Sequence, residues 1–484
     1  MSDSVQLSPS AQKTREYFDA LDTPLSPFAR GYRKLLARYY ALLVPADQTL
    51  LEVGCGTGEL LKHIPAAQRV GIDFSPRQIE RARSIAPDIE FTTDSIPALA
   101  AAGRTFDYII LSDTINYVDD AQALLADLRS ISSPSSRLLI NVPNNLWKPI
   151  FGLAHLLGLR ATQHQNSWLS GQDVRNLLQL ADWDVIKAQP RALVPYAGGF
   201  IERTINRWLA PILPWFCLTQ FIVSRPNHFH ATSSAHPPRP LQKADETTVS
   251  VVVPARNEAG NIEAAITRTP PMGAWTEFIF VEGGSSDNTW EEIQRVKKAY
   301  PEHRIKILQQ SGKGKGNAVR EGFAQAEGDI LMILDTDLTM PPEELPKYFN
   351  ALMQGHCEFA NGCRLIYPMD EHAMRFLNMV ANKTFGLIFS WLLGQPIKDT
   401  LCGTKVLRRS DYEKIAANRA YFGDFDPYGD FDLLFGADRM NLKIRDIPIR
   451  YRDRTYGSTN INRWTGGMLL LRMVFFAARK LKFV

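Results

Sequence analysis

The sequence predicts two α/β domains in series, each with a mostly parallel β-sheet covered by helices. Three observations lead to this fold class. Apolar runs of strand length alternate with helical patterns in both halves of the chain. A glycine-spaced turn follows the strand-like run 49–53, and a second series of strands begins at 249–253. Residues 226–247, rich in Pro, His, Ser and Thr, separate the two series as a linker. The predicted domains are therefore 1–225 and 248–484.

The composition is that of an ordinary globular protein with more than one domain. The chain has 484 residues, of which 45% are hydrophobic and 22% charged. Its five cysteines show neither metal-ligand nor disulfide-framework spacing, which indicates a reducing compartment. The N-terminus is polar, unlike a signal peptide, and no uninterrupted apolar run reaches the ~20 residues that span a bilayer. We expect a cytoplasmic enzyme, in contact with the inner face of the cell membrane.

The first domain opens with a helical segment, 1–45, whose aromatic and basic stripe we interpret as a helix that packs on the following sheet. A strand at 49–53 then leads into Gly54, Gly56 and Gly58. Glycines in this position permit backbone angles closed to other residues and let a ligand approach the main chain. The pattern alone suits dinucleotides and other nucleosides alike.

Three further strands follow, and acids mark their ends. The strand 69–74 contains Asp73, about twenty residues after the glycines, where an acid can bind two ribose hydroxyls. The strand 89–94 ends in Asp94, and 106–113 is the fourth strand. These acids and the glycine turn predict a nucleoside site at the carboxyl ends of the strands.

Residues 45–145 thereby resemble the class I S-adenosylmethionine-dependent methyltransferases, which have a Rossmann-like fold. The family's first motif is matched by Glu52, Gly54, Gly56 and Gly58. The resemblance implies that Asp73 binds the ribose hydroxyls of S-adenosylmethionine and that Asp94 lies near its adenine. A dinucleotide enzyme and a Rossmann-like core without ligand are the alternatives. The methyl acceptor is not identified; His155 and His164 are candidate bases for an oxygen acceptor, or ordinary histidines.

The last part of the first domain predicts a helix and then a strand over 171–190, as in the closing part of such a fold. The apolar stretch 208–223 has 16 residues, which is short for a membrane span, and it contains Pro211 and Pro214. We favour a buried helix there over a segment at a membrane interface.

The second domain begins with the strand 249–253, which ends at Pro254 and is followed by Glu258. A second strand, 277–281, leads into a loop with two glycines, two serines and Asp287, which suits a nucleoside. After a helix at 290–300 and a strand at 305–309, a turn of alternating glycines and lysines precedes another helix. Its two ammonium groups, on Lys313 and Lys315, suit phosphates.

Two carboxylates end the buried strand 330–334. Asp335 and Asp337 would point to opposite faces on a strand, but both can converge where the strand turns into a loop. Such a pair suits a divalent metal that holds a diphosphate. A solvated turn is the alternative for these three residues taken alone.

With the loops in this order, residues 248–460 resemble the inverting glycosyltransferases of family 2, with the GT-A fold. The closest resemblance is to the dolichyl- and polyprenyl-phosphate sugar transferases. It implies that Glu258 and Asp287 hold the uridine or guanosine end of a nucleotide-sugar donor. Pro254, Lys315 and Asp335 belong to the same donor site by this resemblance. Asp335 and Asp337 would hold Mn²⁺ or Mg²⁺, with Asp337 the direct ligand.

An acceptor site is implied by two further segments. Asp399 matches the acid of an Asp-x-x-Ser-Gly-Phe-Arg-like motif and is either the catalytic base or a group that orients the acceptor. Cys402 and Thr404-Lys405 depart from that motif. Residues Arg450, Arg454 and Ser458 are expected to bind phosphate, of the donor or of a lipid. The acidic and aromatic segment 421–432 either contacts the acceptor through Asp430 or Asp432, or is a structured loop.

The C-terminal tail predicts one basic, apolar helix over 464–484. From 439 to the end there are eleven Lys or Arg and two Asp. Such a helix suits an anionic bilayer surface, and a helix packed on its own domain is the alternative. A second apolar helix, 374–393, is a candidate wall of an acceptor groove.

The sequence as a whole predicts a bifunctional enzyme, a methyltransferase fused to a metal-dependent glycosyltransferase. Its expected partners are a UDP- or GDP-sugar, S-adenosylmethionine and an acceptor such as polyprenyl phosphate or a glycolipid, with no nucleic acid. Both halves would then serve one pathway of glycan assembly. Two alternatives stay open: a first half that only binds S-adenosylmethionine or nothing, and a second half that is a nucleotidyltransferase.

Overall fold

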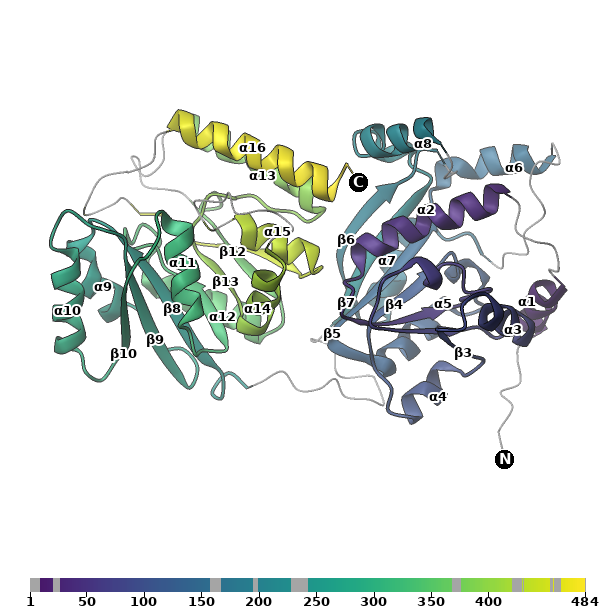
Figure 1. The fold of residues 1–484 in the computed structure, drawn as a ribbon, viewed down its shortest axis with the longest axis horizontal. Helices are drawn as coiled ribbons and strands as arrows, with labels where there is room; N and C mark the ends of the chain where they lie inside the picture. Colours follow the sequence, from purple (N-terminus) through teal and green to yellow (C-terminus); the bar gives the residue numbers. More distant parts are fainter. Residues whose placement is uncertain are drawn as a thin grey trace. The chain divides into compact units, whose positions relative to one another are not determined.

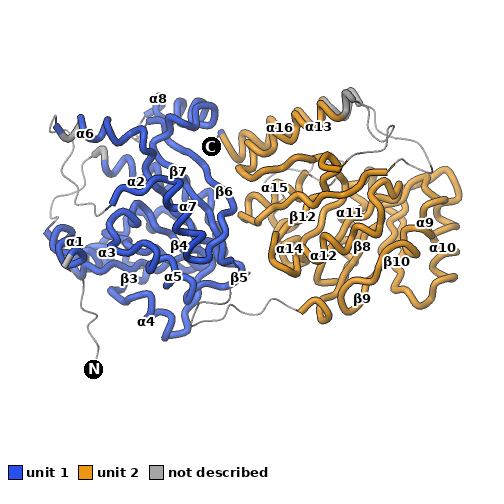
Figure 2. Tube along the Cα trace, turned by 180° about the vertical axis from the view of Figure 1, so that it is seen from behind, with its two compact units in different colours: residues 1–239, 483 blue, residues 240–482, 484 orange. Residues whose placement is uncertain are grey.

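The computed structural model describes residues 9–20, 27–156, 167–194, 199–227, 243–367, 376–419, 429, 431–452, 456 and 463–483. The chain divides into two compact units, residues 1–239 with Phe483 and residues 240–482 with Val484 (Figure 2). This division falls within the predicted linker. The predicted limits at 225 and 248 stay predictions.

Among its described residues, unit 1 is built on a seven-stranded sheet in the order β3-β2-β1-β4-β5-β7-β6 (Figure 1). The strands are β1 (Thr49–Val53), β2 (Gln68–Ile72), β3 (Glu90–Thr92), β4 (Phe106–Ser112), β5 (Ser132–Pro143), β6 (Trp183–Arg191) and β7 (Thr219–Pro226). The strands β3, β2, β1, β4 and β5 pair in parallel. Since β5 and β6 both pair antiparallel with β7, they run in the same direction. The carboxyl ends of every strand except β7 therefore meet at one edge of this sheet.

Helices cover both faces of this sheet because its strands are apolar on both sides. They are α1 (Pro9–Ala20), α2 (Pro27–Leu43), α3 (Pro76–Ile85), α4 (Ile96–Ala101), α5 (Ala121–Asp127), α6 (Lys148–Leu156), α7 (Gly171–Leu180) and α8 (Phe200–Thr204). The predicted packing helix is confirmed in α2, where Leu35, Leu36 and Tyr40 are buried. The ring of Tyr40 meets Phe221 of β7 edge-on, with 5.0 Å between the ring centroids. The predicted helix and strand of 171–190 are confirmed as α7 and β6.

The stretch 208–223 is not the buried helix that its apolar composition predicts. It is divided between the π-helical turn η5 (Ile205–Leu209), the 3₁₀ turn η6 (Pro214–Phe216) and β7. Pro214 opens the 3₁₀ turn and lacks the N–H that a continuing α-helix needs. The β-branched and aromatic residues that follow favour a strand, and they enter the sheet between β5 and β6.

Unit 2 has, within the described residues, a second seven-stranded sheet in the order β10-β9-β8-β11-β13-β12-β14 (Figure 1). The strands are β8 (Thr248–Ala255), β9 (Trp275–Glu282), β10 (Arg304–Gln309), β11 (Ile330–Ile333), β12 (Phe359–Cys363), β13 (Lys405–Arg408) and β14 (Ile444–Pro448). The strand β13 is antiparallel to both its neighbours, and the other pairs are parallel. The carboxyl ends of six strands and the start of β13 therefore share one edge.

The helices of unit 2 include those predicted for 290–300, 374–393 and 464–484. They are α9 (Ile262–Thr267), α10 (Thr289–Ala299), α11 (Lys315–Ala324), α12 (Leu345–Met353), α13 (Phe376–Leu393), α14 (Arg409–Ala417), α15 (Phe431–Arg439) and α16 (Arg463–Leu481). The helices α13 and α16 lie against each other in both views (Figures 1 and 2). In the described parts of the chain, no helix combines the length and apolarity needed to cross a bilayer.

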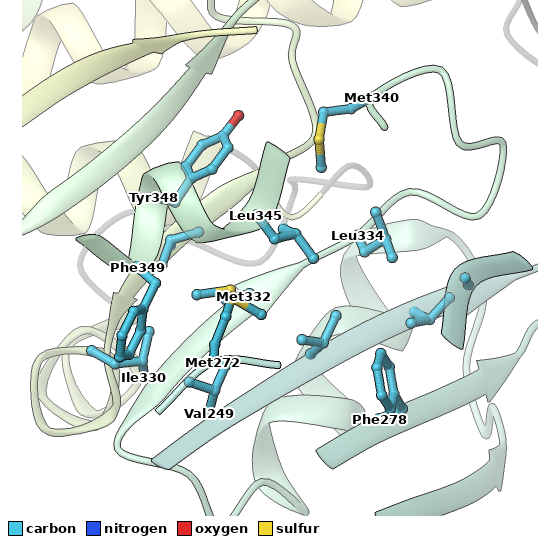
Figure 3. Close-up of a cluster of buried hydrophobic side chains, with 14 of the residues drawn as sticks. Val249, Met272, Phe278, Ile330, Met332, Leu334, Met340, Leu345, Tyr348 and Phe349 are labelled. Carbon is cyan, nitrogen blue, oxygen red and sulfur yellow. The ribbon is translucent and has the colours of Figure 1, made fainter. Parts of the chain in front are cut away.

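The core of unit 2 lies between the sheet and the helices that cover it. Figure 3 shows Val249, Phe278 and Met332 of three neighbouring strands beneath Leu345 and Phe349 of α12. Each of these side chains is buried. This packing fixes the strands whose carboxyl ends bear the polar loops of the site.

Candidate active sites

The backbone of the glycine turn after β1 has the positive φ angles that favour glycine. Gly54 has φ +73°, and a Cβ there would lie 2.6 Å from Cγ2 of Thr114. Gly56 has φ +50°, but nothing lies within 4 Å of the position its Cβ would take. The turn therefore leaves open space beside the main chain at Gly56, where a nucleoside ligand can approach the backbone.

Asp73, just after β2, is joined to this turn. Its Oδ2 accepts a hydrogen bond from Gly56 N at 2.9 Å, and its Oδ1 accepts one from Ser75 N at 2.9 Å. Burial raises the pKa of Asp73 against the effect of these two bonds. The structure thus brings Asp73 and the glycines together. Asp94 lies exposed beyond β3, where Thr92 pairs with Ile72 of β2.

Glu52 is buried at the end of β1, with 1% of its surface exposed. Among the described residues its Oε2 has no hydrogen-bond partner. Burial raises the pKa of Glu52 to about 8, and the Asp73 carboxylate adds to the rise while Arg33 opposes it. A buried carboxyl oxygen without a partner beside an open glycine turn fits a ligand that donates hydrogen bonds. These residues therefore fit S-adenosylmethionine.

A polar cluster that sequence reasoning missed lies at the ends of β4 and β5. Asn141 Nδ2 donates to Asp113 Oδ1 at 2.6 Å, and its Oδ1 accepts from the Tyr40 hydroxyl at 2.7 Å. The Tyr32 hydroxyl donates to Asp113 Oδ1 at 3.4 Å. Burial raises the pKa of both tyrosines, and Asp113 adds to this rise. The available signals were the acid at the end of the fourth strand and the tyrosine stripe of 1–45. Of the candidate bases, the side chain of His155 and all of His164 lie outside the described residues.

In unit 2, Glu258 and Asp287 follow β8 and β9 and share one partner, Thr289. Its hydroxyl accepts from Glu258 N at 3.0 Å and donates to Asp287 Oδ1 at 2.5 Å. Glu258 Oε2 accepts from Asn261 Nδ2 at 2.8 Å. The carbonyl of Pro254 accepts from the Thr336 hydroxyl at 2.6 Å, which joins the end of β8 to the loop after β11. The predicted donor-site residues are therefore neighbours at one edge.

The two acids after β11 lie beside the lysine at the start of α11. Lys315 Nζ is 2.6 Å from Asp335 Oδ1, and both side chains are partly exposed. Asp337 Oδ1 accepts from Thr339 N at 3.2 Å and from its hydroxyl at 2.8 Å. Lys313, the other lysine of the turn, is exposed. The loop thus gathers one cation and two carboxylates where a diphosphate is expected.

This donor set fits Mg²⁺ or Mn²⁺ bound together with a substrate. The described residues contain no group of three or more His, Cys, Asp or Glu side chains that could hold a metal ion. Mg²⁺ is commonly held by one or two carboxylates and by substrate phosphate oxygens rather than by a full set of protein ligands. Asp335 and Asp337 offer such a pair.

Asp399 has the environment of a structural anion. It is fully buried, and its Oδ2 and Oδ1 lie 2.7 and 2.8 Å from Nε and Nη2 of Arg364. Its carboxylate also accepts from Arg364 N at 3.0 Å and from Asn382 Nδ2 at 2.8 Å. Leu401 N and Cys402 N donate to Oδ1, both at 3.1 Å. One carboxylate thus joins the end of β12, the helix α13 and the turn before β13.

This environment disfavours Asp399 as the catalytic base, and it favours the alternative of a group that orients others. Burial alone would raise the pKa of Asp399, but the Arg364 guanidinium and the N–H donors outweigh it and lower the pKa to about 2. A base with so low a pKa accepts a proton poorly near neutral pH. Lys405 is likewise buried and donates to the carbonyl of Cys402 within the turn.

Sequence reasoning missed Arg364, although an arginine directly after a buried strand was a visible signal. Its side chain is 12% exposed, and its guanidinium lies 5.1 Å from the ring centroid of Tyr451. Arg450 is exposed after β14. Arg452 N donates to Thr339 O at 3.0 Å, which places this segment beside the two acids. Arg454, Ser458 and Asp430 lie outside the described residues.

Each unit thus contains an α/β sheet with polar loops at the carboxyl ends of its strands. A family model for a methyltransferase domain matches residues 28–188. A model for glycosyl transferase family 2 matches residues 250–416. The chain therefore contains a Rossmann-like methyltransferase domain followed by a domain of glycosyl transferase family 2 with the GT-A fold.

Individual relatives resemble the second domain. Dolichol-phosphate mannosyltransferase of Pyrococcus furiosus is 32% identical over 177 residues, which are 35% of this chain and 49% of the relative. Undecaprenyl-phosphate 4-deoxy-4-formamido-L-arabinose transferase of Pectobacterium carotovorum is 30% identical over 169 residues, 34% of this chain and 50% of the relative. The chain thus spans about half the length of these relatives. Glucosyl-3-phosphoglycerate synthase of Mycobacterium tuberculosis, solved with Mn²⁺ and UDP, is 19% identical with a TM-score of 0.36, covering 49% of this chain and 80% of that one.

Proposed function

We propose that the second domain transfers a sugar, with inversion, from a UDP- or GDP-sugar to the phosphate of a polyprenyl phosphate. The observation that carries this proposal is the contact between Lys315 and Asp335, with Asp337 two residues on, at the carboxyl end of β11. One cation and two carboxylates suit a diphosphate that binds with a metal ion. The names of the two relatives, which act on dolichol phosphate and undecaprenyl phosphate, support the acceptor class.

The donor's nucleoside is assigned to Glu258 and Asp287, because Thr289 holds both acids in place. Lys315 lies at the start of α11, where its ammonium and the helix N-terminus both favour phosphate. Asp335 and Asp337 would hold Mn²⁺ or Mg²⁺, which neutralises the charge of the leaving diphosphate. The hydrogen bond from the Thr336 hydroxyl to the Pro254 carbonyl holds the loop after β11 against the end of β8. The two metal-binding acids therefore stay close to the residues proposed to bind the nucleoside of the donor.

The acceptor's phosphate is assigned to Arg364, with Asp399 as its positioning residue. Arg364 uses two of its five side-chain N–H groups on Asp399, so three are left to bind an anion. A phosphate monoester is already ionised near neutral pH, since its second pKa is about 6. It therefore attacks without a protein base. Arg450, Arg454 and Ser458 are further candidates for the same phosphate.

The first domain is proposed to transfer a methyl group from S-adenosylmethionine to an intermediate of the same pathway. Gly54, Gly56 and Gly58 form the turn that receives the cofactor, and Asp73 and Glu52 bind it at the ends of β2 and β1. Asp94 is assigned to its adenine. Because the family models cover the domains separately, coupling of the two reactions rests on their covalent linkage alone.

The sugar transfer is tested by release of nucleoside diphosphate from a panel of UDP- and GDP-sugars with manganese. The intact chain is compared with Asp337→Ala, with and without polyprenyl phosphate. The proposal predicts release from one donor that rises with the lipid and is lost in the variant. Release that ignores the lipid excludes this acceptor. Pyrophosphate that forms when a nucleoside triphosphate and a sugar 1-phosphate replace the nucleotide sugar indicates a nucleotidyltransferase instead.

The methyltransferase proposal is tested by calorimetric titration of S-adenosylmethionine into the intact chain. A product search then follows transfer of a labelled methyl group into lipid and water-soluble fractions of a cell extract. Binding with transfer into one fraction supports the proposal. Binding without any transfer identifies a binding module, and absence of binding refutes the cofactor assignment.

A further inference from the structure

The methyltransferase domain has a concentrated apolar surface. Its exposed side chains come from two segments: residues 146–156, which include α6, and residues 200–216, which include α8, η5 and η6. We call the exposed apolar side chains of these two segments the α6–α8 surface. Phe200 is 85% exposed and Trp215 72%. In the described part of unit 1, every exposed large apolar side chain except Leu180 lies in these two segments. Such a concentration marks an interaction site rather than scattered surface residues.

Side-chain hydrogen bonds to the backbone connect the two segments of this surface. Trp147 Nε1 donates to Phe216 O at 3.0 Å, and Asn144 Nδ2 donates to Trp215 O at 2.8 Å. The two segments are therefore joined, and Figures 1 and 2 both show α6 and α8 along the same end of unit 1. Asn206, which is 3% exposed, accepts from two backbone N–H groups of the loop after β6. The exposed side chains thus stand on a fixed backbone.

The α6–α8 surface lies at the same edge of the sheet as the site of this domain. Residues 144–156 leave the carboxyl end of β5, and residues 192–218 connect the carboxyl end of β6 to β7. The glycine turn at Gly54 and Asp73 follow β1 and β2 at that same edge of the sheet. A partner bound to the surface therefore lies at the edge of the sheet that carries the proposed S-adenosylmethionine site.

The charges within the surface favour an anionic partner. Lys148 and Arg203 are exposed, and Arg207 is partly exposed. The one acid of the two segments, Glu202, is 6% exposed, bonds to Asn206 and lies 3.7 Å from a guanidinium nitrogen of Arg38. Tryptophan and phenylalanine among basic side chains are typical of segments that lie in the interface of an anionic bilayer.

The dimensions also suit a bilayer surface. The helix α6 has nine residues, a length of about 13 Å, against a hydrocarbon core of about 30 Å. Its side chains can therefore enter the outer part of a leaflet. We propose that the α6–α8 surface binds an anionic lipid bilayer.

Flotation with lipid vesicles tests this proposal on the intact chain, without S-adenosylmethionine or sugar donor. Its outcome is thus independent of either proposed activity. Vesicles of phosphatidylcholine, with or without one third phosphatidylglycerol, are compared. We expect binding to the anionic vesicles, and roughly tenfold or greater loss in the double variant Trp215→Ser, Phe216→Ser. Both side chains are exposed, so the variant keeps its fold, which circular dichroism verifies.

Two matched controls separate this surface from other apolar side chains. Leu180→Ser changes an exposed leucine of the same domain outside the surface and should bind vesicles as the parent chain does. Leu471→Ser with Phe475→Ser changes the exposed face of α16 in unit 2 and reports any contribution of that helix. Trp215→Phe keeps the apolar character, and should keep binding while intrinsic fluorescence is quenched less by brominated lipid.

Three results would overturn the proposal. The first is a parent chain that ignores anionic vesicles. The second is a double variant that binds them as well as the parent chain. The third is a parent chain that forms dimers which the double variant abolishes, without vesicle binding, because the surface is then a protein interface.

Discussion

Replacing Asp399 by asparagine tests whether this carboxylate positions Arg364 or accepts a proton. The carboxylate accepts six hydrogen bonds, three of them from Arg364. Asparagine has the shape of aspartate but no negative charge. Its amide N–H₂ would face N–H groups that now donate to the carboxylate, so hydrogen bonds would be lost. Lowering of the pKa from 3.8 to about 2 corresponds to ~2 kcal/mol of stability. Removal of one partner from a buried ion pair costs about 3–5 kcal/mol. We expect a loss of about 3 kcal/mol at pH 7.

The pH dependence of this contribution has a definite sign. The folded pKa of Asp399 lies below its ordinary value of 3.8, which applies to the unfolded chain, so the stabilisation is complete above about pH 4. It is lost as pH falls through the folded pKa, about 2. The parent chain should therefore lose this stability between about pH 4 and pH 2, and Asp399→Asn should lack that part of the pH dependence.

Hydrogen exchange in urea, followed on peptides from residues 399–408, measures the stability of this region in the intact chain. Asp446→Asn is the contrasting control, because burial raises the pKa of Asp446 to about 6 and the charge of this carboxylate therefore does not stabilise the folded state near pH 7. Asp399→Asn in an Arg364→Met background should cost at least 2 kcal/mol less than in the parent chain, as expected for a coupled pair. Unchanged stability together with a 10²–10⁴-fold slower sugar transfer would refute this reasoning and restore a general base.

Three other substitutions test the remaining assignments. Asp73→Ala should weaken S-adenosylmethionine binding 10- to 100-fold in calorimetry, because it also frees the glycine turn, while the exposed Asp88→Asn should not. Equal affinity would exclude Asp73 from the site. Lys315→Met should lower kcat/KM for the nucleotide sugar 10- to 100-fold, and Lys313→Met should change it little; equal effects would argue against the Lys315 contact. Burial raises the pKa of Glu52, so the free energy of unfolding of unit 1 should decrease as pH rises from about 4.5 to about 8. Glu52→Gln should show a smaller decrease over this range. Identical urea–pH profiles would show that Glu52 is not buried in its protonated form.

Much of the fold and part of the sites follow from local sequence patterns. The strands that lead into Gly54 and Asp335 were predictable because each apolar run is short and ends in residues that a buried strand does not accommodate. Asp399 shows the limit of this approach. Its low pKa depends on Arg364 and Asn382, which lie 35 and 17 residues away in the chain. No local pattern reports such a contact.

Two other features could not be predicted for the same reason, because they depend on contacts between residues far apart in the chain. The stretch 208–223 has the composition of a buried helix, but its second half pairs with β5, about eighty residues earlier in the chain. The cluster of Tyr32, Asp113 and Asn141 is assembled from a helix and two strand ends. Its members are ordinary residues until the sheet brings them together.

The position of β7 constrains how the chain can be made and divided. Thr219–Pro226 is the last strand of unit 1 in the sequence, yet it lies between β5 and β6 in the sheet. During synthesis, the edges of β5 and β6 that pair with β7 therefore stay unpaired until residue 226 has left the ribosome. Unpaired strand edges promote aggregation. A fragment cut at residue 188, where the family match ends, would keep those edges open permanently. An isolated methyltransferase domain must extend through Pro226.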